Sequence, residues 1–306
     1  MKNILTHADT DGIISAVIFL KASNAQKFKI LFTSTPKVKA NLCRLIAQSE
    51  KLENLNVFDI SPTNLTLKLA SVFKDVLWLD HHKTYEDLEV PPNVKLVIDD
   101  KQPSAAQVVA NYFGIENDEL LEIANEVDTN QIKSEDARFI RDYIGAIKWK
   151  YRGKYVQNKL RNIVLTLLKK GIDMLGNEES AVELVERYRE WCLQSVKDIE
   201  KKILIENVNG KKVAILETTN ILPIYLISEK LKEHKQAPFD IIAFINHRLI
   251  KNKIITKVEL RTHTDFVVYE IAKRLGGGGH EKASGASIEG LFTAADLIKN
   301  LQNYFA

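Results

Sequence analysis

The fold of this chain is constrained most by a regular alternation of short apolar runs and helical patterns in its first 115 residues. The apolar runs predict strands at residues 3–5, 29–33, 55–60, 76–79 and 94–98, and the clearest helical patterns cover residues 12–22 and 38–50. Strands and helices that alternate at this spacing form a doubly wound parallel sheet with helices on both faces. In such sheets, ligands bind at the carboxyl ends of the strands.

The pattern changes twice after this region. Residues 104–204 are almost entirely helical in pattern. Strand patterns return after Asn207-Val-Asn-Gly, at residues 212–217, 240–246 and 254–261, and a terminal helix is expected near residues 294–301. We therefore predict an α/β protein with three parts, which are an N-terminal doubly wound domain over residues 1–150, a helical linker over residues 151–205 and a smaller α/β domain over residues 206–306.

Composition places the chain among globular proteins. Of its 306 residues, 45% are hydrophobic and 27% are charged, and no apolar stretch approaches the length of a bilayer span. The two cysteines, Cys43 and Cys192, belong to no Cys/His cluster, which argues against a disulfide framework and a thiolate zinc site. The N-terminus carries no signal-peptide pattern, so we expect a cytoplasmic protein. The richness in Ile, Lys and Glu favours a thermophilic source.

Four short segments carry acidic and imidazole side chains. In chain order they are His7-Ala-Asp9-Thr-Asp11-Gly12, Asp59, Asp80-His81-His82 and Asp128. The first and third follow predicted strands, Asp59 lies at the end of one, and Asp128 lies on a helical stretch. Carboxylates and imidazoles suit Mn²⁺ and similar divalent ions. Because strand ends converge at one edge of a parallel sheet, these residues predict a site for two ions that share a bridging carboxylate, an arrangement suited to in-line phosphoryl displacement.

These segments resemble the motifs of the DHH superfamily of phosphoesterases, which includes RecJ-type exonucleases, nanoRNases, cyclic-dinucleotide phosphodiesterases and manganese pyrophosphatases. The resemblance implies two divalent metal ions, with Mn²⁺ preferred and Mg²⁺ or Co²⁺ as alternatives. It implies one ion held by His7, Asp9 and Asp59, and a second held by Asp11, Asp59, His81 and Asp128. It also implies catalytic roles for Asp80, which would orient a histidine ligand, and for His82, which would contact the scissile phosphate. The segment 99–105 resembles the turn that follows the triplet, where Ser104 would cap a helix.

A glycine run predicts an anion site in the C-terminal domain. Residues 276–280 read Gly-Gly-Gly-Gly-His, and the N–H groups of consecutive glycines can approach a phosphate closely. The run resembles the Gly-Gly-Gly-His motif of the domain that accompanies DHH domains in nucleases, so we expect substrate to bind at Gly276, Gly277, Gly278, Gly279 and His280. Arg261 matches the arginine that grips substrate in that family. Manganese pyrophosphatases lack this motif, so its presence favours nucleotidyl substrates.

A basic segment follows the first domain. Eight Lys or Arg residues and no acidic residue occur between Lys148 and Lys170, in a chain whose formal net charge is +3. Cationic side chains follow a phosphate backbone, and aromatic side chains stack on unpaired bases. We therefore expect single-stranded DNA or RNA to pass along six residues, which are Lys148, Trp149, Lys150, Tyr151, Arg152 and Lys154.

Three functions fit these features. The first is a phosphodiesterase acting as an exonuclease on single-stranded DNA or RNA, releasing mononucleotides in the 3′ to 5′ direction by resemblance to small archaeal RecJ-like proteins. The second is a nanoRNase or cyclic-dinucleotide phosphodiesterase, which prefers very short substrates. The third is an inactive scaffold in replication or repair, an interpretation opposed by the complete ligand set. A repair or replication protein is a further expected partner, and a membrane is not.

Overall fold

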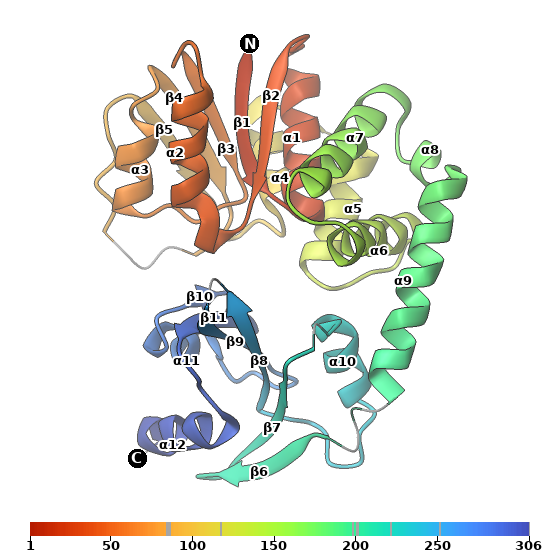
Figure 1. Ribbon diagram of the computed structural model, residues 1–306. Helices are drawn as coiled ribbons and strands as arrows, with labels where there is room; N and C mark the ends of the chain where they lie inside the picture. The colour runs from red at the N-terminus through yellow and green to blue at the C-terminus, as the bar shows by residue number, and fades with distance from the viewer. Residues whose placement is uncertain are drawn as a thin grey trace. The chain divides into compact units, whose positions relative to one another are not determined.

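The computed structural model describes residues 1–83, 87–116, 118–197, 199, 202–220, 222–250 and 252–305. The chain divides into two compact units, Met1–Tyr188 and Arg189–Ala306. Each unit contains one sheet (Figure 1). The predicted α/β class with two sheets is confirmed.

The first unit is built on a five-stranded parallel sheet. Its strands are β1 Lys2–His7, β2 Phe28–Thr33, β3 Asn54–Phe58, β4 Asp75–Asp80 and β5 Val94–Ile98. Their order is β2-β1-β3-β4-β5 and every pairing is parallel. The chain therefore winds outward from β1 in both directions, and the direction changes between β1 and β3. This is the place where doubly wound sheets form their ligand sites.

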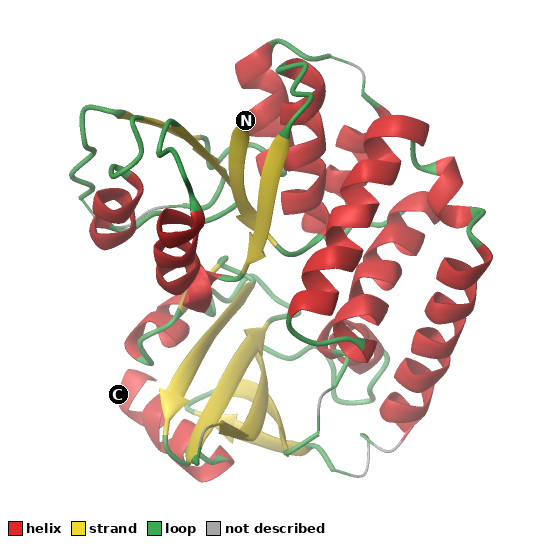
Figure 2. Cartoon of the chain, turned by 45° about the horizontal axis from the view of Figure 1, so that its top comes forward, coloured by secondary structure: helices red, strands yellow, loops and turns green. Residues whose placement is uncertain are grey.

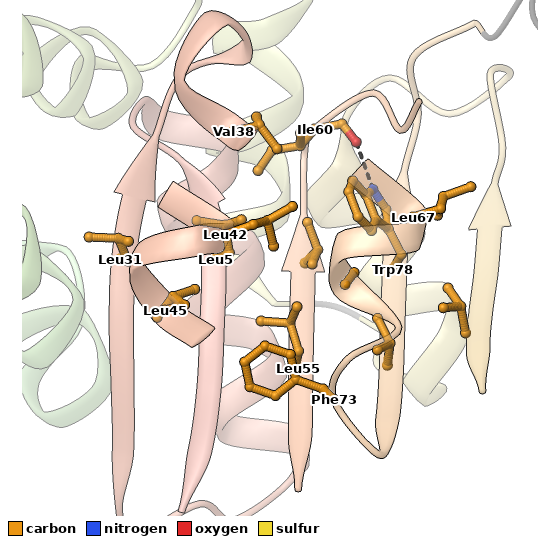
Figure 3. Packing of buried hydrophobic residues seen from close by; sticks show 14 residues of the cluster. Leu5, Leu31, Val38, Leu42, Leu45, Leu55, Ile60, Leu67, Phe73 and Trp78 are labelled. Carbon is orange, nitrogen blue, oxygen red and sulfur yellow. Dashed lines mark hydrogen bonds between the residues drawn. The ribbon is translucent and has the colours of Figure 1, made fainter. Parts of the chain in front are cut away.

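Helices cover both faces of this sheet. On one face, α2 (Val38–Gln48) and α3 (Asn64–Ala70) pack on a cluster of buried aliphatic and aromatic residues (Figure 3). Trp78 is fully buried in this cluster, and its indole N–H donates a 2.7 Å hydrogen bond to the carbonyl of Ile60. Burying a side chain of this size stabilises the fold by roughly 1.5–3 kcal/mol, provided that its polar N–H has a partner.

The other face is covered by a larger helical layer. Its centre is α1 (Thr10–Ala22), in which every residue from Thr10 to Leu20 is buried. Around α1 pack α4 (Ala105–Phe113), α5 (Glu119–Asp128), α6 (Glu135–Lys150) and α7 (Lys154–Lys170). After the short α8 (Asp173–Gly176), the long α9 (Glu179–Lys197) carries the chain from the first unit into the second (Figure 2).

The second unit is a mixed six-stranded sheet. Its strands are β6 Leu204–Val208, β7 Lys211–Thr218, β8 Ile241–Ile250, β9 Lys253–Arg261, β10 Gly278–Gly279 and β11 Ala283–Glu289, in the order β10-β11-β9-β8-β7-β6. The pair β7–β8 is parallel and the others are antiparallel. One face packs on α11 (Tyr269–Arg274) and α12 (Ala294–Phe305), and the other on α10 (Ile224–Leu231). Among the described residues, no helix is both long and apolar enough to cross a membrane.

Candidate metal centre and substrate-binding domain

The first motif is shaped by a tight turn from β1 into α1. Asp9 caps α1, because its carboxylate accepts a 3.1 Å hydrogen bond from the N–H of Gly12. A Cβ atom at Gly12 would overlap the carbonyl of His7, so only glycine lets the helix start this close to the strand. Asp11 lies in the first turn of α1, where its buried carboxylate points away from solvent. The turn thus presents His7, Asp9 and Asp11 at the carboxyl edge of the sheet.

Asp59 follows β3 directly and is buried. Its φ of +57° lies in the left-handed region of the backbone, which residues other than glycine rarely adopt. The backbone N–H of Asp59 donates a 3.2 Å hydrogen bond to the carbonyl of Leu79, at the end of the neighbouring strand β4. Strained backbone of this kind gathers at functional sites.

The triplet at the end of β4 uses its two histidines differently. Nδ1 of His82 lies 2.7 Å from the Asp80 carboxylate, so Asp80 orients His82. Nδ1 of His81 lies 3.3 Å from the carbonyl of Gln102. A carbonyl can only accept, so His81 carries its proton on Nδ1 and directs the lone pair of Nε2 to the acidic residues. The carbonyl of Gln102, a residue that no sequence motif singles out, therefore orients His81, whereas the Asp80 carboxylate orients His82.

Two helix ends complete the cluster. Both carboxylate oxygens of Asp11 accept hydrogen bonds from the N-terminus of α4, at 2.7 Å from the N–H of Ala105 and 2.8 Å from that of Ala106. Ser104 caps α4 through a hydrogen bond from the N–H of Gln107, as predicted. Asp128 is the last residue of α5, and its carboxylate lies 3.4 Å from Nε2 of His81.

These side chains converge on two overlapping sets. His7, Asp9 and Asp59 form the first, and Asp11, Asp59 and His81 form the second; in each set the three ligand atoms lie within 4.8 Å of one another. Nε2 of His81 lies 3.7 Å from Asp11 and 3.9 Å from Asp59. Nδ1 of His7 lies 3.6 Å from the Asp59 carboxylate and also contacts that of Asp9. Asp59 belongs to both sets.

The crowding of carboxylates changes their proton affinities. Burial and the charge of Asp9 raise the pKa of Asp11 to about 7. Burial and the charge of Asp9 raise the pKa of Asp59 well above its ordinary value. Burial and the charge of Asp11 likewise raise the pKa of Asp128 well above its ordinary value. Burial lowers the pKa of His81. Burial would also lower the pKa of His82, but the Asp80 carboxylate raises it to about 9.

This cluster fits divalent cations. Buried carboxylates that raise each other's pKa are costly without a cation to balance them. Oδ2 of Asp59 is buried and accepts no hydrogen bond from any residue that the structure describes. The donor set is oxygen and imidazole nitrogen, which suits Mn²⁺ and Mg²⁺ rather than thiolate-binding ions. The residues present can therefore hold metal.

The glycine run in the second unit is ordered by close packing. Gly276 follows α11 with a φ of +76°, and Gly278–Gly279 form the edge strand β10 beside β11. A Cβ atom at Gly279 would lie 2.7 Å from the carbonyl oxygen of Ala283, so this backbone approach requires glycine. His280 then begins a tight turn, with its N–H donating 2.8 Å to the carbonyl of Ala283.

Arg261 ends β9 at the same edge of this sheet. It pairs in register with Ala283, the residue at which β11 leaves the His280 turn. One guanidinium nitrogen donates 2.8 Å to the carbonyl of Leu260, and Glu259 lies 3.9 Å away. Burial lowers the pKa of Arg261, partly offset by Glu259. The sheet thus brings Arg261 and residues 276–280 together at one edge.

The residues of the basic segment make contacts of different kinds. The guanidinium of Arg152 donates to the carbonyls of Lys148, Trp149 and Tyr151, so it closes the C-terminus of α6. The Trp149 ring packs 6.1 Å from that of Tyr188. Lys148, by contrast, lies close enough to the first motif to affect Asp9. Burial raises the pKa of Asp9, but the charge of His7 and, more weakly, that of Lys148 bring this pKa below its ordinary value. Tyr155, outside the six residues expected, exposes 61% of its surface.

The comparisons agree with this geometry. The DHHA1 domain family matches residues 210–306, which include Arg261 and the whole glycine run. Residues 210–306 are therefore a DHHA1 domain. No curated protein matched its sequence.

Solved structures share the fold of this chain over nearly its whole length. The pGpG-specific phosphodiesterase PggH from Vibrio cholerae has a TM-score of 0.59 at 17% identity, with 99% of each chain covered. The DHH domain of a protein assigned to a family of ribosomal proteins has a TM-score of 0.65 at 14% identity, with 99% of this chain and 86% of that one covered. RecJ from Thermus thermophilus, in complex with Mn²⁺, has a TM-score of 0.61 at 13% identity. The match covers 99% of this chain and 52% of that RecJ, so this chain spans about half of its length.

Proposed function

We propose that this protein is a divalent-metal-dependent phosphodiesterase that acts as a 3′ to 5′ exonuclease on single-stranded DNA or RNA and releases mononucleotides. The observation that carries the proposal is the convergence of Asp11, Asp59 and His81 beside His7 and Asp9 at the carboxyl edge of the sheet. The DHHA1 domain supports a nucleotidyl substrate, because it contributes an arginine and glycine backbone suited to phosphate.

The two sets would hold two ions. His7, Asp9 and Asp59 would bind one, and Asp11, Asp59, His81 and Asp128 would bind the other, with Asp59 shared. Mn²⁺ is the preferred ion in this proposal, with Mg²⁺ or Co²⁺ as alternatives, because the donors are carboxylates and imidazoles. When bound, such ions supply a hydroxide at neutral pH and stabilise charge on a phosphoryl group.

The protein's own groups would position the substrate. Asp80 holds His82 through Nδ1, which leaves Nε2 to face a phosphate. In the DHHA1 domain, the forked guanidinium of Arg261 and the N–H groups of residues 276–280 would bind a second part of the nucleotide. These placements support a catalytic function for Asp80 and His82 and substrate binding by the glycine run.

A strand would leave the metal centre along the basic segment. Lys148 acts on the charge of Asp9, so the segment begins at the centre. Lys150 lies 5.6 Å from the ring of Tyr151, and Tyr155 is exposed beside Lys154. We assign the cationic part of the path to Lys148, Lys150 and Lys154, and base stacking to Tyr155. Trp149 and Arg152 support the path through their packing and capping contacts.

A second candidate is hydrolysis of very short substrates. PggH, a pGpG-specific phosphodiesterase, matches this chain over 99% of both lengths, whereas only 52% of Thermus RecJ is covered. The two-unit plan of this chain is therefore shared from end to end with an enzyme named for a dinucleotide substrate, and that correspondence favours the short-substrate function.

The decisive experiment is a hydrolysis assay on single strands labelled at either end, on dinucleotides and on pGpG, with Mn²⁺ or with EDTA. The proposal expects Mn²⁺-dependent shortening of long strands from the 3′ end. Cleavage of dinucleotides and pGpG alone would replace the exonuclease with the short-substrate function. Full activity in EDTA would contradict both.

A further inference from the structure

A cleft of about 300 Å³ lies along α7 in the first unit, apart from the acidic cluster. One wall is a single face of α7 that carries Lys159, Asn162, Thr166, Lys169 and Lys170. The opposite wall contains Tyr143 of α6, Leu175 of α8 and Glu178. A cleft of this volume is within the size range of small-ligand sites.

The lining is suited to an anion. Three ammonium groups and one carboxylate give the cleft a formal excess of two positive charges. Lys169 and Lys170 are exposed and form no ion pair with any residue in the described ranges. Burial, with the charge of Glu178, raises the pKa of Tyr143 to about 12, so its phenol keeps its proton as a hydrogen-bond donor. The amide of Asn162 and the hydroxyl of Thr166 add donors of the kind that bind phosphate oxygens.

The direction of α7 relates this cleft to the metal centre. The side chain of Gln157 accepts from the N–H of Phe32 at 2.9 Å and donates to its carbonyl at 2.8 Å, near the carboxyl end of β2. One turn later, the guanidinium of Arg161 lies 6.0 Å from the ring of Phe28, at the amino end of β2. Therefore α7 starts at the edge that holds the acidic cluster and runs away from it, and Lys169 and Lys170 lie at its far end.

A cation–aromatic contact links the cleft to the start of the path. The ammonium groups of Lys150 and Lys159 each lie 5.6 Å from the ring centre of Tyr151. Lys150 belongs to the path next to the metal centre, and Lys159 lines the cleft. The Tyr151 ring therefore holds one lysine of the path and one lysine of the cleft close together.

We propose that this cleft is a distal subsite that binds a backbone phosphate of the same single strand whose end lies at the metal centre. This inference rests on the proposed function. Between Lys154 and Lys170 the helix rises by about 24 Å, at roughly 1.5 Å per residue. A stacked strand advances about 3.4 Å per nucleotide, so the Lys169 and Lys170 end of the subsite is reached by strands of about seven nucleotides or more. Substrates of two nucleotides do not reach it.

The test compares two double variants with the same charge change. Lys169→Gln with Lys170→Gln alters the cleft, whereas Lys51→Gln with Lys74→Gln alters exposed lysines elsewhere in the same unit. Binding of a fluorescent strand of about 12 nucleotides and of a dinucleotide is measured in EDTA over a range of salt concentrations. The cleft variant should bind the long strand more weakly, and its salt slope should fall by about 0.7, the change expected when one phosphate contact is lost. Its dinucleotide affinity should equal that of the wild type, as should both affinities of the control.

A third variant tests the sign of the effect. Glu178→Gln removes the one carboxylate that lines the cleft among the described residues, so it should bind the long strand more tightly and leave the dinucleotide unaffected. An unchanged salt slope in the lysine variant would overturn the subsite. So would an equal loss of affinity for a mononucleotide, since that result identifies a site for free nucleotides.

Binding in EDTA separates this proposal from the proposed function. If the wild type cleaves no diester with Mn²⁺ but the length-dependent loss is seen, the subsite stands and the exonuclease function falls. If cleavage is seen without that loss, only the subsite falls.

Discussion

At the scale of the residue, Asp59 has the most demanding role in the candidate centre. Its backbone is in the left-handed region, its carboxylate is buried, and it belongs to both ligand sets. Losing it should disturb both ions, whereas losing any other ligand disturbs one.

We predict that Asp59→Ala lowers Mn²⁺-dependent hydrolysis by more than about 100-fold, beyond the roughly 10–100-fold cost of losing a residue that orients a ligand. The fall should accompany a loss of bound Mn²⁺ measured by calorimetry. Asp75→Ala is the matched control, because Asp75 is an exposed aspartate at the opposite end of the neighbouring strand β4. Retention of two Mn²⁺ ions by Asp59→Ala would show that Asp59 does not bridge.

At the scale of the element, the site depends on how closely α1 starts behind β1. The hydroxyl of Thr6 donates 2.6 Å to the carbonyl of Gly12, and the Gly12 Cα faces the backbone of His7. A side chain at position 12 would push the helix away from the strand that carries His7.

Gly12→Ala is therefore expected to destabilise the protein by about 1–3 kcal/mol, the usual cost of overpacking, and to weaken Mn²⁺ binding at the same time. Urea unfolding and metal titration measure the two effects. Gly176→Ala in α8 is the control, since a Cβ atom there meets nothing within 4 Å. Normal stability and metal affinity in Gly12→Ala would contradict the tight turn.

The same scale shows what the sequence can predict. All five strands of the first sheet are predictable, because each is an apolar run closed by polar residues, and the acidic motifs follow from their ends. Gln102, which orients His81, is missed because only the fold brings a carbonyl from 21 positions away to that ring. The strands β10 and β11 are missed because glycine and small residues give no alternating pattern. The sequence places Arg152 on the expected nucleic-acid path but gives no sign that its guanidinium also caps the C-terminus of α6.

At the scale of the whole molecule, the two units should respond separately to metal and to nucleotide. Every ligand in the two metal sets lies in the unit Met1–Tyr188, and Arg261 and the glycine run lie in the unit Arg189–Ala306.

At about 100 times its Kd, each bound Mn²⁺ ion should stabilise the first unit by about 2.7 kcal/mol, because an ion that binds only the folded state shifts the folding equilibrium. Hydrogen exchange should slow in β1, β3 and β4 but stay unchanged in β7, β8 and β9. The Asp59→Ala variant should show no such protection. Slower exchange in both sheets to the same extent would mean that the ions do not act through the first unit alone.

The converse prediction concerns Arg261. Its guanidinium is partly buried at the edge that holds residues 276–280, and a charge-assisted hydrogen bond to a phosphate there contributes about 1.5–3 kcal/mol. Arg261→Ala should therefore bind a dinucleotide roughly 10–100-fold more weakly while keeping its Mn²⁺ content, as measured by fluorescence anisotropy and metal analysis. Arg261→Lys should recover only part of the affinity, since an ammonium group cannot make the forked contact. Arg274→Ala, which removes an exposed arginine packed 4.5 Å from the Tyr304 ring in the same unit, should bind normally. Loss of Mn²⁺ from Arg261→Ala would instead place this arginine in the metal centre, and the division of roles between the two units would be wrong.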